Sequence, residues 1–209
     1  MDGKTLRGAR RGGRQVQLLA AMEHTTRRVL AQPEVDGAPG EVPGLKPLER
    51  LDLAGTVVTA DALQTHAEAA DFLVTVKQAH YRFTIKANQP TLLGRCEWLA
   101  WHNVPVLDRT RDQAHGRVAI RTLKAVSVRG LGGFPHAAQV LQVTRKVCDL
   151  GTRSWRTTVI DAVTSLAHAQ AGPARHSTPM TRLRRQAITL GPLPVRTLQA
   201  SSAKVTSRT

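Results

Sequence analysis

Two aspartates, Asp2 and Asp61, lie in parts of the sequence whose residue types are suited to phosphate chemistry. Asp2 opens the run DGKTLRG, which also supplies the cations Lys4 and Arg7. Asp61 directly follows the β-branched run TVVTA. In open α/β sheets, ligands and catalytic groups gather at the carboxyl ends of strands. Each aspartate also has a purely structural interpretation, because Asp-Gly is a common turn dipeptide and Asp61 can help to start a following helix.

A second polar group follows the next alternating segment, in the run KANQP. It consists of Lys86, Asn88 and Gln89, and taken alone it is a polar loop of low specificity. Further on, His115 and Arg117 lie between a polar stretch and a predicted strand. A histidine in a basic protein is more often a surface residue than a catalyst, so the sequence leaves both interpretations open.

Several familiar chemistries have no motif in this chain. The eight histidines show neither HExxH nor zinc-finger spacing, which excludes the common zinc sites. Neither the GxxxxGK[ST] of P-loop ATPases nor the GxSxG of α/β-hydrolases is present. Cys96 and Cys148 form no CxxC pair, which is typical of a protein from a reducing interior.

The charge balance indicates a polyanionic partner. Thirty Lys and Arg residues face fifteen Asp and Glu residues, a formal net charge of +15, and nucleic acid is the simplest partner for such a chain. Aromatic residues make up only 3%, so a sheet paved with base-stacking rings is not expected. No apolar run approaches the roughly 18 residues of a membrane helix, so no membrane partner is expected. No carboxylate follows Asp161.

The first third of the chain predicts a hairpin and a short helix. Residues 15–22 and 28–35 are short, apolar-rich and joined by a polar connection, which predicts two paired strands. Residues 36–44 are rich in Gly and Pro and predict a loop. Residues 45–53 carry leucines at helical spacing and predict a helix.

The middle of the chain predicts a strand, a helix and a strand. Residues 56–60 predict a buried strand that ends at Asp61. Thr65 with Glu68 forms a capping box for a helix, and residues 80–86 alternate with period two. This order is a βαβ unit and implies a parallel pair of strands.

The remaining segments predict more strands than helices. We expect a helix at 92–101, a charged loop at 104–114, and extended segments at 117–128, 137–147 and 156–164. The coarse expectation is one mixed α/β domain over residues 1–166, followed by an irregular basic extension over 167–209 that is disordered or frame-shifted.

The order of these motifs is more specific than any one of them. The chain reads DGKTLRGA, a hairpin, LDLAGTVVTADALQT, HYRFTIKANQPTL, HGRVAIRT, FPHAAQV and VTSL. From residue 1 to about 174 it resembles the insertion-sequence DDE transposases of the H-repeat-associated type. The resemblance implies a ribonuclease-H-like domain, an α/β fold with a mixed sheet flanked by helices.

The resemblance also implies a reaction. In such a domain one carboxylate lies on the first strand, a second at the end of the fourth and a third on a later helix. Together they hold two Mg²⁺ ions for DNA strand cleavage and transfer. By position Asp2 matches the first acid and Asp61 the second, on strands expected to be neighbours.

The resemblance extends to partners and location. It implies binding to insertion-sequence ends in the cytoplasm, at the nucleoid, and is compatible with a homo-oligomer. A DNA-contacting or site-supporting role is expected for the polar groups of the matching motifs, although the role of the HGR motif within the family is uncertain. These residues are Lys4, Arg7, Lys86, Asn88, Gln89, His115, Arg117 and Arg121.

Departures from the family pattern bear on activity. The helix with the third acid has no counterpart, Ala119 stands where the HGR motif is expected to carry an acid, and only Glu41 survives of a Lys-Thr-Asn-Glu pattern. Asp2 is the second residue, so its strand lacks an upstream half. We therefore expect a remnant, truncated at both ends and frame-shifted near residue 175, with little or no strand-transfer activity. The alternative is a basic DNA-binding protein without catalysis.

Overall fold

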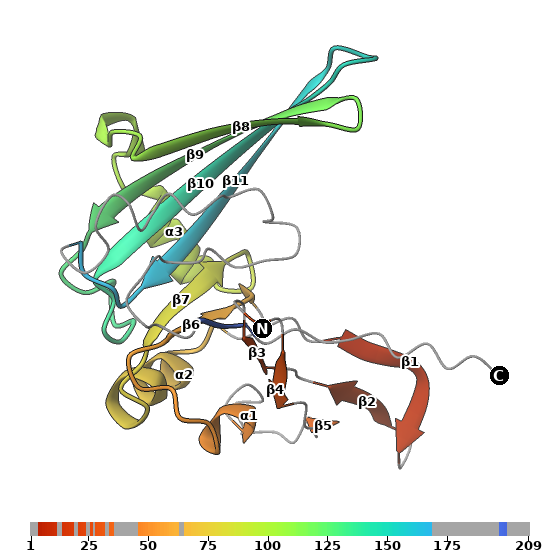
Figure 1. Cartoon of the computed structure of the whole chain (residues 1–209). Helices are drawn as coiled ribbons and strands as arrows, with labels where there is room; N and C mark the ends of the chain where they lie inside the picture. The colour runs from red at the N-terminus through yellow and green to blue at the C-terminus, as the bar shows by residue number, and fades with distance from the viewer. Residues whose placement is uncertain are drawn as a thin grey trace.

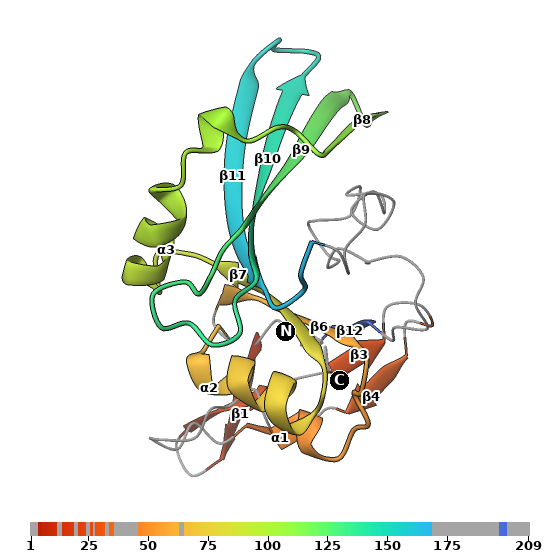
Figure 2. The same cartoon turned by 90° about the vertical axis from the view of Figure 1, so that its left-hand side faces the viewer.

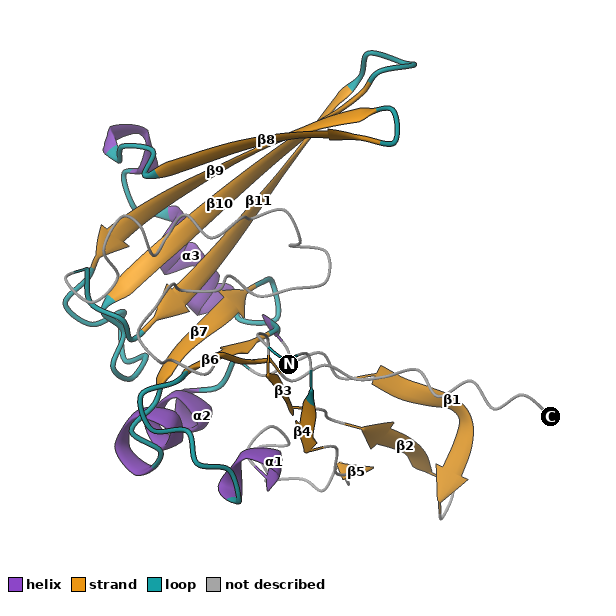
Figure 3. Ribbon diagram, viewed as in Figure 1, coloured by secondary structure: helices purple, strands orange, loops and turns teal. Residues whose placement is uncertain are grey.

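The chain forms a mixed α/β structure in which strands far outweigh helices (Figure 3). The computed structural model describes residues 4–11, 14–18, 21–23, 26, 28–31, 34–35, 46–62, 65–168 and 197–199. Within these residues none of the helices is long and apolar enough to cross a membrane. The mixed α/β class predicted from the sequence is confirmed.

The main sheet is mixed, and its strand order is β4-β3-β12-β6-β7-β11-β10-β9-β8 (Figure 1). Its strands are β3 (Ala21–Glu23), β4 (Val29–Ala31), β6 (Val57–Ala60), β7 (His80–Ile85), β8 (Asp108–Ala114), β9 (Arg117–Ser127), β10 (Gln139–Asp149), β11 (Trp155–Thr164) and β12 (Thr197–Gln199). A smaller sheet contains β1 (Lys4–Arg11), β2 (Arg14–Leu18) and β5 (Glu34–Val35).

The predicted hairpin is confirmed, and each of its two arms contributes one strand to the smaller sheet and one to the main sheet. β2 pairs antiparallel with β5, and β3 pairs antiparallel with β4, so the two arms of the hairpin remain partners over both pieces. The predicted helix at 45–53 is shorter than expected. Only α1 (Lys46–Glu49) is helical, and Leu51 N–H then bonds to the carbonyl of Leu48.

The predicted βαβ unit is also confirmed. β6 and β7 are parallel, with Val57 opposite His80 and Ala60 opposite Phe83. All four residues of β6 are buried, which explains its unbroken apolar and β-branched sequence. The crossover contains α2 (Ala67–Asp71), which continues into one π-helical segment, η2 (Phe72–Val76).

The predicted capping box is wrong. The residue before α2 is His66, and no side chain caps the helix there. Thr65 Oγ1 instead donates to the carbonyl of Thr84 at 2.7 Å. Thr65 is completely buried beside β7, so a tertiary acceptor competes successfully with the local helix N-terminus for its hydroxyl.

Four long antiparallel strands extend the sheet beyond β7, and we call β8–β11 the blade (Figure 1). It follows α3 (Pro90–Glu97) and the 3₁₀ turn η3 (Trp101–Asn103). The blade joins β7 through β11, with Asp161 opposite Ile85 and Thr164 opposite Arg82. The extended segments predicted at 117–128, 137–147 and 156–164 are β9, β10 and β11.

The loop predicted at 104–114 is wrong over most of its length. Residues Asp108–Ala114 form β8, which pairs with β9 along its whole length. β8 is the edge of the sheet, and its sequence DRTRDQA is polar on both faces. Charged residues on edge strands are a common protection against unwanted strand pairing, and they remove the apolar alternation that would reveal a strand.

Helices α2 and α3 contribute to one core cluster on the face of the sheet that carries Tyr81, Phe83 and Ile85. We call this the helix face and the other side the opposite face. Tyr81 is completely buried, stacks on Phe83 with ring centroids 4.8 Å apart, and donates to the carbonyl of Pro135 at 2.6 Å. Figure 2 shows α3 standing beside β7 and the base of the blade.

The expected irregular extension at 167–209 lies largely outside the described residues. Three of its residues form β12, which lies between β3 and β6. It runs parallel to β6, with Thr197 opposite Val57 and Gln199 opposite Thr59, and antiparallel to β3. A short piece of the extension therefore takes part in the main sheet.

Candidate functional site

The ends of β6 and β7 bring together Asp61 and Lys86, which are far apart in the sequence. Asp61 is the first residue after β6, and Lys86 is the first after β7. Since the two strands are parallel, their carboxyl ends meet at the same edge of the sheet. Lys86 Nζ lies 2.8 Å from Asp61 Oδ1, and the Ala62 N–H donates to the same oxygen at 2.8 Å.

The electrostatics keep Asp61 ionised. Partial burial opposes ionisation and raises its pKa, but the hydrogen bonds from Lys86 and from the Ala62 N–H, together with the positive charge of Lys86, outweigh burial. The pKa of Asp61 therefore lies below its usual value. The ion pair is partly open to solvent, with side-chain exposures of 58% for Lys86 and 35% for Asp61, so an approaching phosphate could reach the ammonium group.

Asn88 and Gln89 cross-link the two connections at this edge. Asn88 Nδ2 donates to the carbonyl of Ala62 at 2.9 Å, and Gln89 Nε2 donates to the carbonyl of Thr65 at 2.8 Å. The loop after β7 is thus tied to the loop after β6. Both amides donate to backbone carbonyls close to Asp61, and the DNA-contacting or site-supporting role expected for them stays a prediction.

The N-terminal candidates are not assembled around Asp61 in the described part of the chain. Asp2 lies outside the described residues. Lys4 and Arg7 belong to β1, which pairs with β2 in the smaller sheet. The expectation that the strand after Asp2 lies beside β6 is wrong for β1, because β12 occupies that place.

The HGR motif lies at the end of the blade. His115 and Gly116 form the β8–β9 turn with positive φ angles of 50° and 68°. Arg117 pairs with Asp149 at 3.4 Å, and the buried Arg121 binds Asp112. Arg117 is about 23 Å along β9 from Lys124, the residue level with the end of β7, so the motif is separate from Asp61.

Asp161 is a buried carboxylate that sequence reasoning did not place in a site. It is 5% exposed, accepts a hydrogen bond from Gln142 Nε2 at 3.2 Å, and lies opposite Ile85 on the helix face. Burial raises its pKa, and the negative charge of Glu97 adds to this effect. Asp61 continues the alternation of Val57 and Thr59 on the opposite face, so the sheet separates the two carboxylates.

The described residues alone do not fit a Mg²⁺ site. In this part of the chain no three His, Cys, Asp or Glu side chains gather within reach of one ion. Asp61 is the described carboxylate directly after β6, and its Oδ1 already accepts from Lys86 and Ala62. Two-metal phosphoryl transfer needs several oxygen ligands held in fixed positions.

A pocket of about 670 Å³ lies on the blade, away from Asp61. None of the residues singled out in the sequence lines it. Its members come from all four strands of the blade, so no local motif joins them. Comparisons with protein-family models, with curated proteins and with solved structures found no match to this chain.

Proposed function

We propose that this chain is a DNA transposase of the DDE type, related to the H-repeat-associated insertion-sequence enzymes, that has lost most of its strand-transfer activity. The observation that carries the proposal is the Asp61–Lys86 pair, 2.8 Å apart at the carboxyl ends of two parallel strands. The resemblance requires its second acid at the end of such a strand. The amides of Asn88 and Gln89 support this position through the loops.

The described ligands at the strand ends support the proposed low activity. Mg²⁺ is the cofactor that the resemblance implies, and of the described residues only Asp61 is offered to it. Lys86 competes with a metal ion for the same carboxylate oxygen. Lys86 can still act without catalysis, because an exposed ammonium beside a strand end can bind a DNA phosphate.

The second candidate is a basic DNA-binding protein without catalysis. It is favoured by the net charge of +15, together with the finding that no three His, Cys, Asp or Glu side chains of the described residues gather around one point. Lys and Arg side chains that neutralise phosphates give binding that is independent of sequence and weakens steeply as salt is added. Both candidates bind DNA, and they differ in whether Asp61 supports cleavage.

A cleavage assay separates the candidates. The full chain is incubated with Mg²⁺ and a labelled duplex that carries the DNA flanking its gene, and strand breaks are counted. We expect binding with weak cleavage that disappears in Asp61→Asn. Asp52→Asn is the matched control, because Asp52 is exposed and, among the described residues, accepts from the N–H of Ala54, a role that asparagine retains.

Each outcome of the assay decides one part of the proposal. Weak cleavage that is lost in Asp61→Asn and kept in Asp52→Asn supports the transposase remnant. Robust cleavage that depends on Asp61 overturns the loss of activity and keeps the enzyme class. Binding without any cleavage overturns the enzyme in favour of the second candidate. Absence of DNA binding overturns both candidates.

A further inference from the structure

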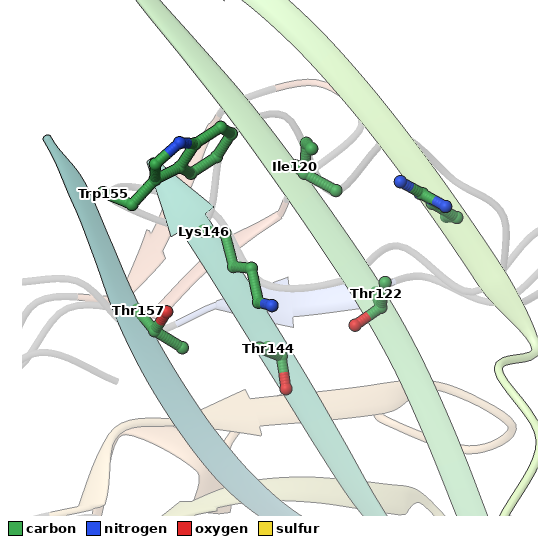
Figure 4. Close-up of a pocket in the computed structure, with 7 residues that line it drawn as sticks. Ile120, Thr122, Thr144, Lys146, Trp155 and Thr157 are labelled. Carbon is green, nitrogen blue, oxygen red and sulfur yellow. The ribbon is translucent and has the colours of Figure 1, made fainter. Parts of the chain in front are cut away.

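The pocket of about 670 Å³ lies on the helix face of the blade. Figure 4 shows its side chains rising from neighbouring strands on one side of the sheet. Strand register brings them together, because Thr144 lies opposite Thr122, and Lys146 lies opposite Thr157. Arg109, on the edge strand, lies opposite Thr122. The result is a groove with two cations, three threonine hydroxyls and one indole.

The two faces of the blade differ in their charge. Asp108, Asp112 and Asp149 alternate onto the opposite face, where Asp112 binds Arg121 and Asp149 binds Arg117. Arg109 and Lys146 lie on the groove side and have no acidic partner within the described chain. The groove is therefore a positive surface with no compensating carboxylate, which is complementary to phosphate.

Trp155 gives the groove a stacking surface. Its side chain is 54% exposed at the outer end of the groove, although Cys148, directly opposite in the register, is buried. A half-exposed indole offers apolar and π surface on which a flat ring can stack. The half-exposed ring lies about one strand spacing from the Lys146 strand, so a base and its phosphate can be bound together.

We propose that this groove binds an unpaired segment of DNA, with Arg109 and Lys146 on successive phosphates and one base stacked on Trp155. The choice of DNA rests on the proposed function. The single-stranded form follows from the geometry, because the faces of bases in a duplex are covered by their neighbours and are closed to an indole. The three threonines supply short, uncharged donors to backbone oxygens.

Binding is measured by fluorescence anisotropy with a fluorescein-labelled oligothymidylate of about 12 nucleotides, in EDTA so that no metal-dependent step contributes. The full chain should bind this strand more tightly than a duplex of the same length. Trp155→Leu should weaken binding about tenfold, since stacking of one base is worth roughly that factor. Trp155→Phe should restore most of the affinity.

The two cations are tested through the salt dependence. Removing two phosphate contacts in Arg109→Ala/Lys146→Ala should reduce the slope of log affinity against log salt by about 1.4. The matched controls are Trp98→Leu, which removes a 90% exposed indole elsewhere, and Arg156→Ala, which removes an exposed cation next to Trp155 on the opposite face. Neither control should change the preference for a single strand.

Unchanged binding by Trp155→Leu and an unchanged salt slope in the double variant would overturn the groove, provided that all variants melt at the temperature of the wild type. Preference for duplex, or for oligouridylate over oligothymidylate, would overturn an unpaired DNA strand as the ligand. If the chain binds DNA through the groove but never cleaves it, only the proposed function is overturned. If the chain cleaves DNA without using the groove, only this inference is overturned.

Discussion

Lys86 Nζ lies 2.8 Å from Asp61 Oδ1 across the ends of two parallel strands, and this contact joins two loops that are separated in the chain by α2, η2 and β7. The contact holds the carboxylate in its ionised form and places an exposed ammonium beside it. Ion pairs that are this open to solvent contribute little to stability. The Asp61–Lys86 contact therefore matters for the charges that it holds at the ends of the two strands, and much less for stability.

The Asp61–Lys86 pair predicts a small loss of stability in acid. The pKa of Asp61 is lower in the folded chain than in the unfolded chain, so the contribution is complete above the unfolded value of 3.8 and is lost as the pH falls through the folded value. Asp61→Asn should cost less than about 1 kcal/mol at pH 7. The difference from wild type should vanish at the lowest pH, in urea titrations at several pH values. A loss equal at every pH would contradict this explanation.

The raised pKa of Asp161 predicts that stability depends on pH in the opposite direction. Burial raises its folded pKa, so the unfolded chain ionises first and stability falls as the pH rises from 3.8 through the folded value. Asp161→Asn removes this penalty and keeps an oxygen to accept from Gln142. We expect the variant to melt at a higher temperature than wild type at pH 7, with a smaller gain at pH 4.

Asp161→Ala is the control for that result. It also removes the charge, but it leaves the amide of Gln142 without its acceptor and creates a small cavity, so it should be less stable than Asp161→Asn. Equal melting temperatures for wild type and Asp161→Asn at every pH would show that the carboxylate carries no burial penalty.

Tyr81 predicts a measurable cost for one hydroxyl. Its ring is completely buried, and its hydroxyl donates to the carbonyl of Pro135 at 2.6 Å. Tyr81→Phe keeps the stacking on Phe83 but leaves that carbonyl unpaired, which should cost about 1–2 kcal/mol in urea unfolding. Phe83→Ala should cost more, about 3–5 kcal/mol, because it opens a cavity in the same core. A neutral Tyr81→Phe would mean that the carbonyl finds another donor.

The two cysteines predict slow reaction with thiol reagents. Both are free and buried. Burial raises the pKa of the Cys96 thiol to about 12, and the negative charges of Asp161 and Glu97 contribute. At pH 8 the native chain should react with Ellman's reagent only as fast as it opens, and both thiols should react at once in denaturant. Rapid modification of the native chain would show that Cys96, on the buried side of α3, or Cys148 is accessible to the reagent.

The local sequence pattern was sufficient to predict part of the fold. Residues 57–60 and 80–85 show a buried and an alternating strand directly in their side chains, and their separation by a helix-length segment requires a parallel pair. The placement of Asp61 at the end of the first strand followed from the same pattern. β8 was missed because an edge strand with charges on both faces has no apolar period. Thr65 was assigned to a capping box because its true acceptor, the carbonyl of Thr84, is distant in sequence.

The sequence by itself determined the basic charge, the βαβ unit and the polar residues that end its strands, because all three depend on composition or on contacts within a short segment. Only the tertiary structure decided which of those polar residues meet. It joined Asp61 to Lys86, put Asp161 on the other side of the sheet, and collected Arg109, Lys146 and Trp155 into one groove. Strand register is the physical reason, since a shift of one residue would move every side chain to the other face.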